Sequence, residues 1–231
     1  MPEVTPIVFI VDEDASTRDS IEALVLRAGM RPVVFGTARE FLAHSRVASP
    51  CCLVLDVRLP DANGLDLQQQ VAERIEMPVI FMTGCADVAT SVRAMKAGAL
   101  EFLCKPTDEG ELLVAVLDAI ERSRSVLAHE AELQALSERH ASLTRRERQV
   151  MALVVAGHLN KQVGGRLGIS EITVKAHRGK VMRKMQAASF AHLVSMAARL
   201  DLTRRSSISS EGVVAPIGRV YYPPWNPSPL Y

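Results

Sequence analysis

The sequence of 231 residues contains no apolar run that approaches the roughly 18 residues needed by a membrane-spanning helix. Its first residues, 1–6, carry one acidic residue and two prolines, and they lack the basic-then-apolar order of a secretory signal. Apolar residues make up 48% and charged residues 23% of the chain, the mixture of a globular protein. These absences predict a cytoplasmic protein that does not span a membrane.

The four cysteines show no paired spacing of the kind that holds a metal ion. Cys51 and Cys52 are adjacent and open an apolar run, which is typical of core positions. Cys85 and Cys104 lie apart in the sequence. We therefore expect the cysteines to belong to the core rather than to a metal site or a redox sensor.

The chain has almost no net charge, +1 at pH 7, but this value hides a division. Residues 1–122 contain 11 Lys and Arg against 19 Asp and Glu, a net charge of −8, whereas residues 144–200 contain 11 against 2, a net charge of +9. The length of 231 residues also exceeds the roughly 100 to 150 of a typical single domain. We predict an acidic domain followed by a basic one, whose Lys and Arg replace the counterions on nucleic-acid phosphates.

Short apolar runs alternate with helical patterns through the first half of the chain. Five such runs are each followed by a helix-like stretch, and the runs occupy residues 7–11, 32–35, 52–55, 78–82 and 100–103. Strands that are apolar throughout have no polar side to show water, so they belong to a parallel sheet covered on both faces. The pattern predicts an α/β doubly wound, five-stranded parallel sheet, in which reactive residues gather beyond the carboxyl ends of the strands.

The second half of the chain has a helical pattern throughout. Apolar residues among many charges, with no Gly or Pro after Gly110, predict one long amphipathic helix over residues 109–139. Helical patterns broken at glycines then predict a small all-α domain, and serines followed by prolines predict a disordered tail. The predicted α/β domain, helical linker, all-α domain and tail occupy residues 5–122, 123–141, 142–201 and 202–231.

Acidic residues or their partners follow three of the predicted strands: Asp12, Glu13 and Asp14 follow the first, Asp56 the third and Lys105 the fifth. These ends converge in a parallel sheet. Clustered carboxylates repel one another unless a cation lies among them, and oxygen-only ligands of this sort suit Mg²⁺. With Mg²⁺ and Lys105 holding phosphoryl oxygens, the Asp56 carboxylate could attack phosphorus in line and become an aspartyl phosphate.

Thr83, which ends the fourth predicted strand, could hydrogen-bond the new phosphoryl group. Two simpler interpretations stay open for the other residues. The acids after the first strand could form a helix N-cap region, in which Asp14 or Ser16 caps the helix, and this role is compatible with metal binding. Phe102 lies inside a short apolar strand, where an aromatic residue normally belongs to the core, although a switching role is an alternative.

Four separated motifs occur in the order seen in the receiver domain of two-component systems, and they resemble that family: VDED at 11–14, LVLDVRLPDANGLDL at 53–67, MTG at 82–84 and FLCKP at 102–106. The resemblance spans residues 5–122 and implies the flavodoxin-like receiver fold. Each motif alone would be a weak signal. Four in the right order make a specific one.

The resemblance implies a role for each matching residue. Mg²⁺ would be held by Asp12, Glu13, Asp56 and the carbonyl of Arg58. A sensor histidine kinase or a small phosphodonor would phosphorylate Asp56, Lys105 would contact the phosphoryl group, and Thr83 and Phe102 would report the change. The family usually has Asp-Asp where this chain has Asp12-Glu13, so the longer Glu13 could alter metal affinity or the lifetime of the phosphoryl group.

Helix signals in the basic half are those of a DNA-reading motif. Thr144 and Glu147 have the spacing of a capping box that opens a first helix. A short helix over residues 160–167 turns at Gly168 into a third helix capped by Ser170, which is the arrangement of a helix-turn-helix. A solvated basic helix is the simpler alternative. The coincidence of capping box, turn glycine and charge excess favours DNA binding.

The stretches LTRRERQVMALVVAGHLNKQ and GISEITVKAHRGKVMRKM resemble the LuxR-type helix-turn-helix of FixJ-like response regulators, over residues 142–200. By position, the resemblance implies DNA contacts from Lys161, Thr173, Lys175, Ala176, His177, Arg178 and Lys180. Gly164 and Gly165 stand where the family usually has larger residues. Because each glycine disfavours a helix by about 1 kcal/mol relative to alanine, we expect a soft helix there.

These features predict a response regulator that is phosphorylated on Asp56. Phosphorylation would bring two copies of the chain together and so control DNA binding and transcription. We expect activation of transcription rather than repression. The implied partners are a sensor histidine kinase, DNA, RNA polymerase and a second copy of the chain, with no membrane. The predicted chemistry is limited to self-phosphotransfer and slow autodephosphorylation. Two alternatives are a DNA-binding regulator that works without phosphorylation because Glu13 weakens the switch, and a hydrolase that uses Asp56 on external substrates.

Overall fold

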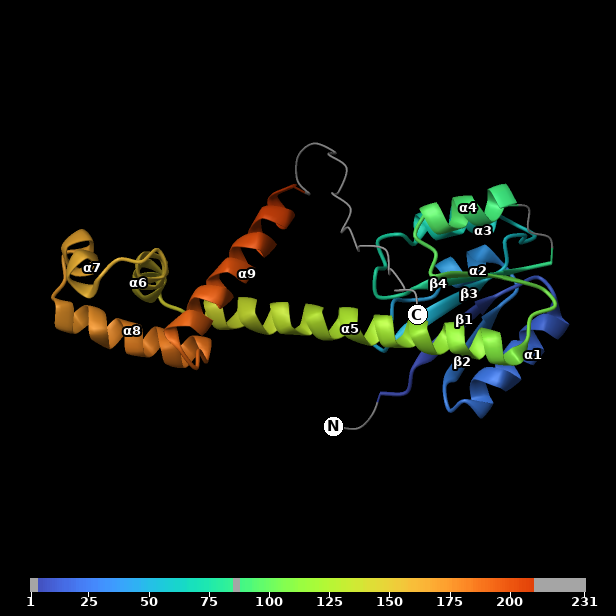
Figure 1. Ribbon diagram of the computed structural model, residues 1–231, viewed down its shortest axis with the longest axis horizontal. Coiled ribbons are helices and arrows are strands. Elements are labelled where there is room, and N and C mark those ends of the chain that lie inside the picture. Colours follow the sequence, from blue (N-terminus) through green and yellow to red (C-terminus); the bar gives the residue numbers. More distant parts are fainter. Residues whose placement is uncertain (1–3, 85–87, 210–231) are drawn as a thin grey trace, which may run out of the picture. The chain divides into compact units, whose positions relative to one another are not determined.

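The computed structural model describes residues 4–84 and 88–209, with side chains described up to residue 200 (Figure 1). The chain divides into two compact units, Met1–Glu132 and Leu133–Tyr231. Helix α5 (Glu109–Ala141) contributes residues to both units. Within the described ranges, no helix is long and apolar enough to cross a membrane.

A five-stranded parallel sheet forms the centre of the first unit. Its strands are β1 (Ile7–Val11), β2 (Arg31–Phe35), β3 (Cys51–Leu55), β4 (Val79–Thr83) and β5 (Glu101–Cys104). The strand order is β2-β1-β3-β4-β5, and each neighbouring pair is parallel. The structure confirms the predicted doubly wound α/β class, and each strand begins and ends within one residue of its expected position.

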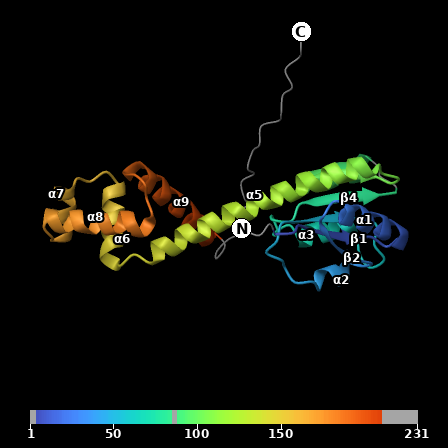
Figure 2. The same ribbon diagram turned by 90° about the horizontal axis from the view of Figure 1, so that it is seen from below.

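Helices cover both faces of this sheet (Figure 2). One face carries α1 (Ala15–Arg27) and α5, and the other carries α2 (Ala38–Leu42), α3 (Gly64–Gln70) and α4 (Val88–Lys96). Along β1, Val8 and Ile10 pack under α1 and α5, whereas Phe9 and Val11 pack on the opposite side. Because alternate side chains enter two different cores, the whole strand is apolar.

The cysteines divide between core and surface. Cys51 and Cys52 are buried at the start of β3, as expected, and burial raises the pKa of the Cys51 thiol to about 11. Cys104 is exposed, so the expected core position is wrong for this residue. It ends β5, which is an edge strand of the sheet and is only partly covered. Cys85 lies outside the described residues.

The packing of the first unit extends beyond the expected boundary at residue 122. Ser123, on α5, is fully buried. Its hydroxyl accepts a hydrogen bond from the backbone N–H of Cys51 at 2.9 Å and donates one to the carbonyl of Glu76. This serine joins α5 to the start of β3 and to the loop before β4, so the helix leaves the first unit later than the sequence pattern predicts.

Up to residue 209, where the description of the chain ends, the second unit is all-α, as predicted. This described part contains the end of α5 and four further helices: α6 (Arg145–Val155), α7 (Asn160–Leu167), α8 (Glu171–Met185) and α9 (Phe190–Ser209). The capping box of Thr144 and Glu147 is present, Ser170 caps α8, and Gly168 ends α7 in the left-handed region at φ 65°. The start of α6, the end of α7 and the start of α8 therefore lie where the sequence predicted them.

Helix α9 extends past residue 201, the predicted end of the all-α domain. It continues to Ser209, so the first residues of the predicted tail are helical. The reason is that residues 201–209 contain no Gly or Pro to stop the helix. The rest of the predicted tail, residues 210–231, lies outside the described part of the chain.

The adjacent glycines of α7 differ in surroundings. A Cβ atom added at Gly164 would lie 2.7 Å from the carbonyl oxygen of Ile169, in the turn before α8, whereas one at Gly165 would meet no heavy atom within 4 Å. Gly164 therefore allows α7 to approach the turn closely. Gly165 has no such role.

We predict opposite effects for alanine at these two positions. Gly165→Ala should raise the free energy of unfolding of the second unit by about 1 kcal/mol, the helix-propensity gain. Gly164→Ala should lower it by roughly 1 to 3 kcal/mol, because the backbone must shift to avoid the Ile169 carbonyl. Urea denaturation of the full chain followed by circular dichroism measures both. Equal stabilisation by the two substitutions would contradict the close approach.

Glu147 is a buried charged residue of the second unit. Its Oε2 accepts hydrogen bonds from Lys184 Nζ at 2.7 Å and from the Thr144 N–H at 2.8 Å. These bonds, that of Lys184 above all, lower the pKa of the Glu147 carboxyl from 4.5 to about 2. A carboxyl whose pKa is depressed by folding stabilises the folded state above its unfolded pKa, and this contribution is lost as the pH falls through the folded pKa.

Glu147→Gln should therefore destabilise the second unit at pH 7 by on the order of 2 kcal/mol, the usual size of a hydrogen bond to a charged group. The difference from the wild type should shrink as the pH falls from about 4.5 to about 2, because the wild-type carboxylate is protonated over that range. The matched control is Glu171→Gln, whose exposed ion pair with Lys175 at 3.5 Å should contribute little. Denaturation at several pH values measures the difference, and a gap that stays constant with pH would contradict this account.

Candidate functional site

Three of the predicted strand-end residues meet at one point. Asp12 follows β1, Asp56 follows β3 and Lys105 follows β5. The ammonium of Lys105 lies 2.5 Å from Asp12 Oδ2 and 2.7 Å from Asp56 Oδ2. Both aspartates are buried, and only 20% of the Lys105 side chain is exposed. One positive charge therefore bridges two buried carboxylates.

The second oxygen of each carboxylate is held by the backbone. Asp12 Oδ1 accepts a hydrogen bond from the N–H of Asp14 at 3.0 Å, and Asp56 Oδ1 accepts one from the N–H of Arg58 at 3.1 Å. Behind Asp56, a Cβ at Gly64 would lie 2.2 Å from the Asp56 carbonyl oxygen, so only glycine fits there. These contacts fix both carboxylates in one orientation.

Burial and hydrogen bonding act in opposite directions on these charges. Burial raises the pKa of the Asp12 carboxyl, although the hydrogen bond from Lys105 lowers it. Burial disfavours the charged form of Lys105, but its hydrogen bonds to Asp12 and Asp56 outweigh this effect and raise the pKa of the Lys105 ammonium. Lys105 is therefore fully charged at neutral pH, where it compensates the two aspartates.

The donor set is compatible with a hard cation. The Asp12 and Asp56 carboxylates supply only oxygen, as does the Arg58 carbonyl that follows Asp56, and Mg²⁺ prefers such ligands. Glu13, the other predicted ligand, is exposed. In the described part of the chain, no three Asp, Glu, His or Cys side chains form a group that could hold a metal ion. The cluster thus brings together two of the three predicted carboxylates, with Lys105 as their cation.

The acid that follows these residues has a structural role. Asp14 caps α1, and its carboxylate accepts hydrogen bonds from the Ser16 N–H and hydroxyl and from the Thr17 hydroxyl at 2.8 Å. The hydrogen bond from Thr17, followed by those from Ser16, lowers the pKa of the Asp14 carboxyl. The N-cap interpretation therefore holds for Asp14, and Ser16 is a donor rather than the cap.

Thr83 and Phe102 lie on neighbouring strands. Thr83 ends β4, is fully buried, and its hydroxyl has no hydrogen-bond partner among the residues that the structure describes. Phe102 on β5 is half-buried, and its ring centroid lies 5.9 Å from that of Phe81. Phe102 thus packs at the margin of the core, whereas Thr83 keeps a buried polar group without a partner.

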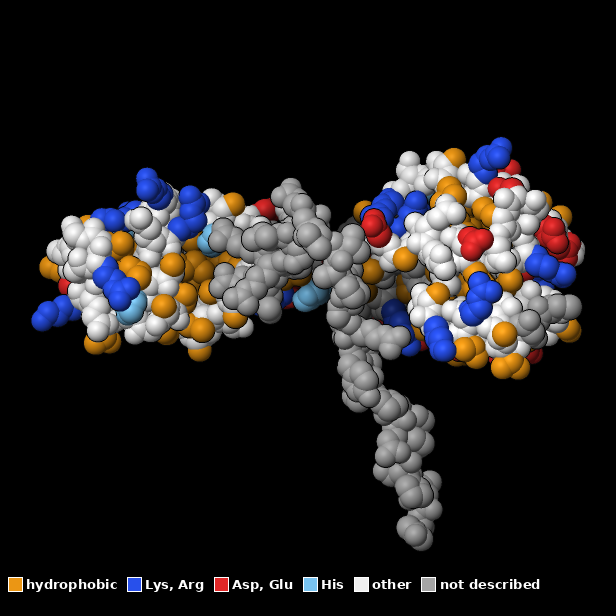
Figure 3. All heavy atoms as spheres, turned by 90° about the horizontal axis from the view of Figure 1, so that it is seen from above, with side chains coloured by type: hydrophobic (Ala, Val, Ile, Leu, Met, Phe, Trp, Pro, Cys, Tyr) orange, Lys and Arg blue, Asp and Glu red, His pale blue; other side chains and the backbone are white. Residues whose placement is uncertain are grey.

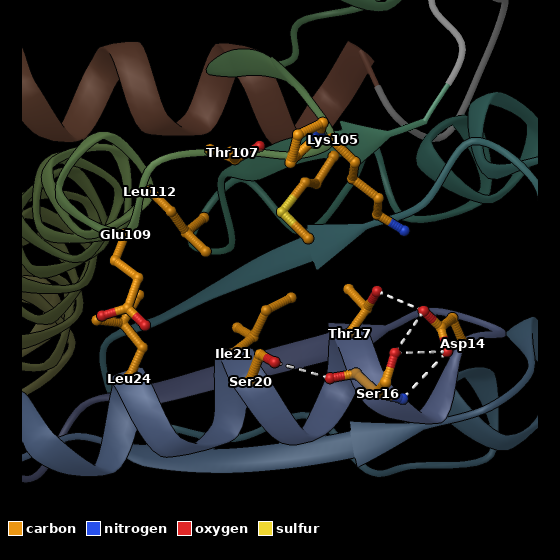
Figure 4. A pocket seen from close by; sticks show the side chains of 12 residues that line it. Asp14, Ser16, Thr17, Ser20, Ile21, Leu24, Lys105, Thr107, Glu109 and Leu112 are labelled. Carbon is orange, nitrogen blue, oxygen red and sulfur yellow. Dashed lines mark hydrogen bonds between the residues drawn. The ribbon is translucent and has the colours of Figure 1, made fainter.

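A cavity of about 500 Å³ opens beside this cluster, between α1 and the connection from β5 to α5 (Figure 4). Apolar side chains line it from α1 (Ile21 and Leu24) and from α5 (Leu112), and α1 also contributes hydroxyl groups. Lys105 belongs both to the cavity wall and to the carboxylate cluster.

The predicted DNA-contacting residues lie on α7 and α8. Five of them are exposed: Lys161, Thr173, Lys175, Ala176 and Lys180. Lys and Arg side chains are visible over this unit in Figure 3. His177 and Arg178 are only half-exposed, and the Arg178 guanidinium is bound by Asn160 and stacks on Phe190. These two partners could not be predicted from the sequence, because they are 18 and 12 residues away from Arg178 and form no motif with it.

The fold and these two sites define a two-domain regulator, with a charged strand-end cluster in the α/β domain and a helix-turn-helix in the second. Comparison with known families agrees. The receiver domain of response regulators matches residues 8–117, and the bacterial regulatory proteins of the luxR family match residues 141–197. The chain belongs to the two-component response regulators of the FixJ-like group.

Individual relatives cover most of the chain. Nodulation protein W of Bradyrhizobium diazoefficiens is 46% identical over 198 residues, which cover 85% of this chain and 87% of that protein. The transcriptional regulatory protein FixJ of the same organism is 38% identical, covering 84% of this chain and 96% of that protein. Among solved structures, the response regulator StyR matches with a TM-score of 0.77 at 40% identity, covering 84% of this chain and 99% of that chain.

The chain is therefore a response regulator that joins a receiver domain to a LuxR-type DNA-binding domain. Receiver domains of this family typically bind Mg²⁺ at their acidic site.

Proposed function

We propose that Asp56 is the phosphoacceptor of this regulator, and that Asp12, Glu13, Asp56 and the Arg58 carbonyl hold Mg²⁺. The observation that carries the proposal is the Lys105 ammonium between two buried carboxylates, at 2.5 Å and 2.7 Å. Two buried carboxylates that share one ammonium need positive charge beside them, and a bound metal ion would add to it. When bound, Mg²⁺ neutralises phosphoryl oxygens and so favours attack on phosphorus.

The transfer step uses the residues of the cluster. A carboxylate oxygen of Asp56 forms a bond to phosphorus while the bond between phosphorus and the kinase histidine nitrogen breaks. Lys105 already donates to Asp56 Oδ2, so its ammonium can follow the negative charge onto the phosphoryl group. Later attack of water on phosphorus restores the carboxylate and releases phosphate, which is the slow autodephosphorylation.

Thr83 is the residue that should respond to the new group. A buried hydroxyl without a hydrogen bond costs roughly 1 to 3 kcal/mol, and a phosphoryl oxygen is an acceptor that would offset this cost. Phe102 lies beside Phe81 on the neighbouring strand, and its half-buried ring can repack when Thr83 moves. These two residues would carry the signal to the surface of α4 and β5.

The proposed consequence is pairing of two chains. Helix α4 exposes three apolar residues at helical spacing, Val88, Val92 and Met95, and α5 exposes Val114 and Leu117. The three α4 residues share one face of that helix, and exposed apolar residues grouped in this way are typical of an interaction surface. Two paired chains would place two helix-turn-helix domains on two half-sites and act on RNA polymerase, with activation as the expected outcome.

DNA contacts are proposed for the exposed residues of α7 and α8. Lys161 and Lys175 would contact phosphates, and Thr173, Ala176 and Lys180 would lie along the groove. His177 lies on the same helix but is only half-exposed, so it would contribute from the edge of this surface. The resemblance also implies a contact from Arg178, but this residue is half-buried and bonded within the domain.

One observation favours an alternative, a regulator that works without phosphorylation. Glu13 is exposed and joins no three-residue metal group among the described residues. A weak metal site would leave Asp56 unphosphorylated while the DNA-binding domain still functions. The phosphorylation experiment separates the two possibilities.

We predict that the full chain, treated with Mg²⁺ and acetyl phosphate, gains a single phosphoryl group by intact-mass measurement. Asp56→Asn should gain none, because the amide is not a nucleophile. The matched control is Asp14→Asn, which should still be phosphorylated, since Asp14 caps α1 and asparagine is also a good cap. An unmodified wild type, or an adduct that persists in Asp56→Asn, would contradict the assignment.

A second prediction concerns Lys175. Lys175→Ala should weaken binding to any duplex and reduce the slope of log affinity against log salt concentration by about 0.9, because one phosphate contact is lost. Arg122→Ala, an exposed position on the first unit, should leave the slope unchanged. Fluorescence anisotropy with a labelled duplex over a salt series measures both. A wild-type slope in Lys175→Ala would contradict a phosphate contact from this residue.

A further inference from the structure

Arg178 differs from the other cationic residues of the reading helix. Lys175 and Lys180 are exposed, whereas Arg178 is half-buried. Its Nη1 donates a hydrogen bond to Asn160 Oδ1 at 2.7 Å, and its guanidinium carbon lies 5.4 Å from the centre of the Phe190 ring. One N–H donor of the guanidinium and its stacking surface are thus engaged within the domain.

The two partners of Arg178 lie at the starts of two other helices. Asn160 is the first residue of α7, and Phe190 is the first residue of α9. A single side chain on α8 therefore connects the first turns of both neighbours. A planar guanidinium can stack and donate at the same time in a fixed geometry, which a lysine ammonium cannot reproduce.

We propose that Arg178 is a positioning residue for DNA recognition and contacts neither bases nor phosphates. It holds the first turn of α7, which carries Lys161, at a fixed place relative to the reading face of α8. A contact with DNA would compete with its hydrogen bond to Asn160 and its stacking on Phe190. The proposal rests on the proposed use of α8 as the reading helix, and it removes Arg178 from the direct contacts that the family resemblance implies.

The contacts of Arg178 with Asn160 and Phe190 fix the position of Lys161 relative to Lys175. A phosphate contact fixes the register of a protein on the duplex, and base contacts depend on that register. Loosening the start of α7 should therefore weaken binding to a preferred sequence more than binding to DNA in general. A lost phosphate contact should instead weaken both equally.

The test uses the full chain and two duplexes: one that the wild type selects from a random-sequence library, and one of scrambled sequence. The variants are Asn160→Ala, Arg178→Lys and the double substitution. None of them alters the formal charge of the domain. Each single variant should lose about tenfold in affinity for the selected duplex and less than twofold for the scrambled one. The double variant should lose no more affinity for the selected duplex than either single variant, because both substitutions remove the same hydrogen bond between Asn160 and Arg178. Phe190→Leu, which keeps an apolar side chain but no ring, should behave like Arg178→Lys.

Two results would overturn the proposal. One is an Asn160→Ala variant whose affinity for the selected duplex is within twofold of the wild-type affinity, since the hydrogen bond to Arg178 would then not contribute to recognition. The other is a salt slope lowered by about 0.9 in Arg178→Gln, which would show a phosphate contact. If α8 is not the reading helix, Lys175→Ala should leave the DNA affinity and the salt slope unchanged. This outcome distinguishes failure of the proposed DNA-binding function from failure of the proposal for Arg178. Thermal unfolding of each variant, followed by circular dichroism, confirms that the domain is folded.

Discussion

The ammonium of Lys105, placed between the carboxylates of Asp12 and Asp56, is the interaction on which the first domain depends. The two acids are buried at the ends of neighbouring parallel strands, where their charges would otherwise repel each other. Lys105 comes from the far edge of the sheet, so the cluster forms only when β1, β3 and β5 are in register. The same arrangement is reactive, because a cation that compensates two carboxylates also accommodates the charge of a phosphoryl group.

The second domain uses its charges in two ways. Lys184 and Arg178 are held inside the domain, by Glu147 and by Asn160 with Phe190, whereas Lys161, Lys175 and Lys180 are exposed. A charge count over the sequence treats all of these residues alike. The structure separates the cations that connect helices from those that are exposed to solvent.

Much of the fold could be predicted from the sequence, because its signals are local. Continuous apolar runs located the five strands to within one residue, and the capping box at Thr144 located α6. The convergence of Asp12, Asp56 and Lys105 also followed, since parallel strands place their carboxyl ends together. Contacts between distant residues could not be predicted. The buried hydroxyl of Ser123 lies within an ordinary helical pattern, and its hydrogen bonds to β3 and to the loop before β4 leave no trace in the sequence.

The glycine pair of α7 shows the same limit. Propensity alone treats Gly164 and Gly165 alike and indicates a soft helix. In the structure, the absence of a side chain at Gly164 lets the Ile169 carbonyl approach, and at Gly165 it serves no contact. The departure from the family pattern is therefore required by packing at Gly164, whereas at Gly165 it only lowers the stability of the helix.

The central claim is that occupation of the site formed by Asp56 and Lys105 controls DNA binding. The most direct measurement is the affinity of the full chain for a duplex selected from a random library, with and without Mg²⁺ and beryllofluoride, which mimics a phosphoryl group on aspartate. The account predicts that the wild type binds at least tenfold more tightly with beryllofluoride, a coupling of about 1.4 kcal/mol, and that Asp56→Asn does not respond. Equal affinities with and without beryllofluoride in the wild type would contradict it.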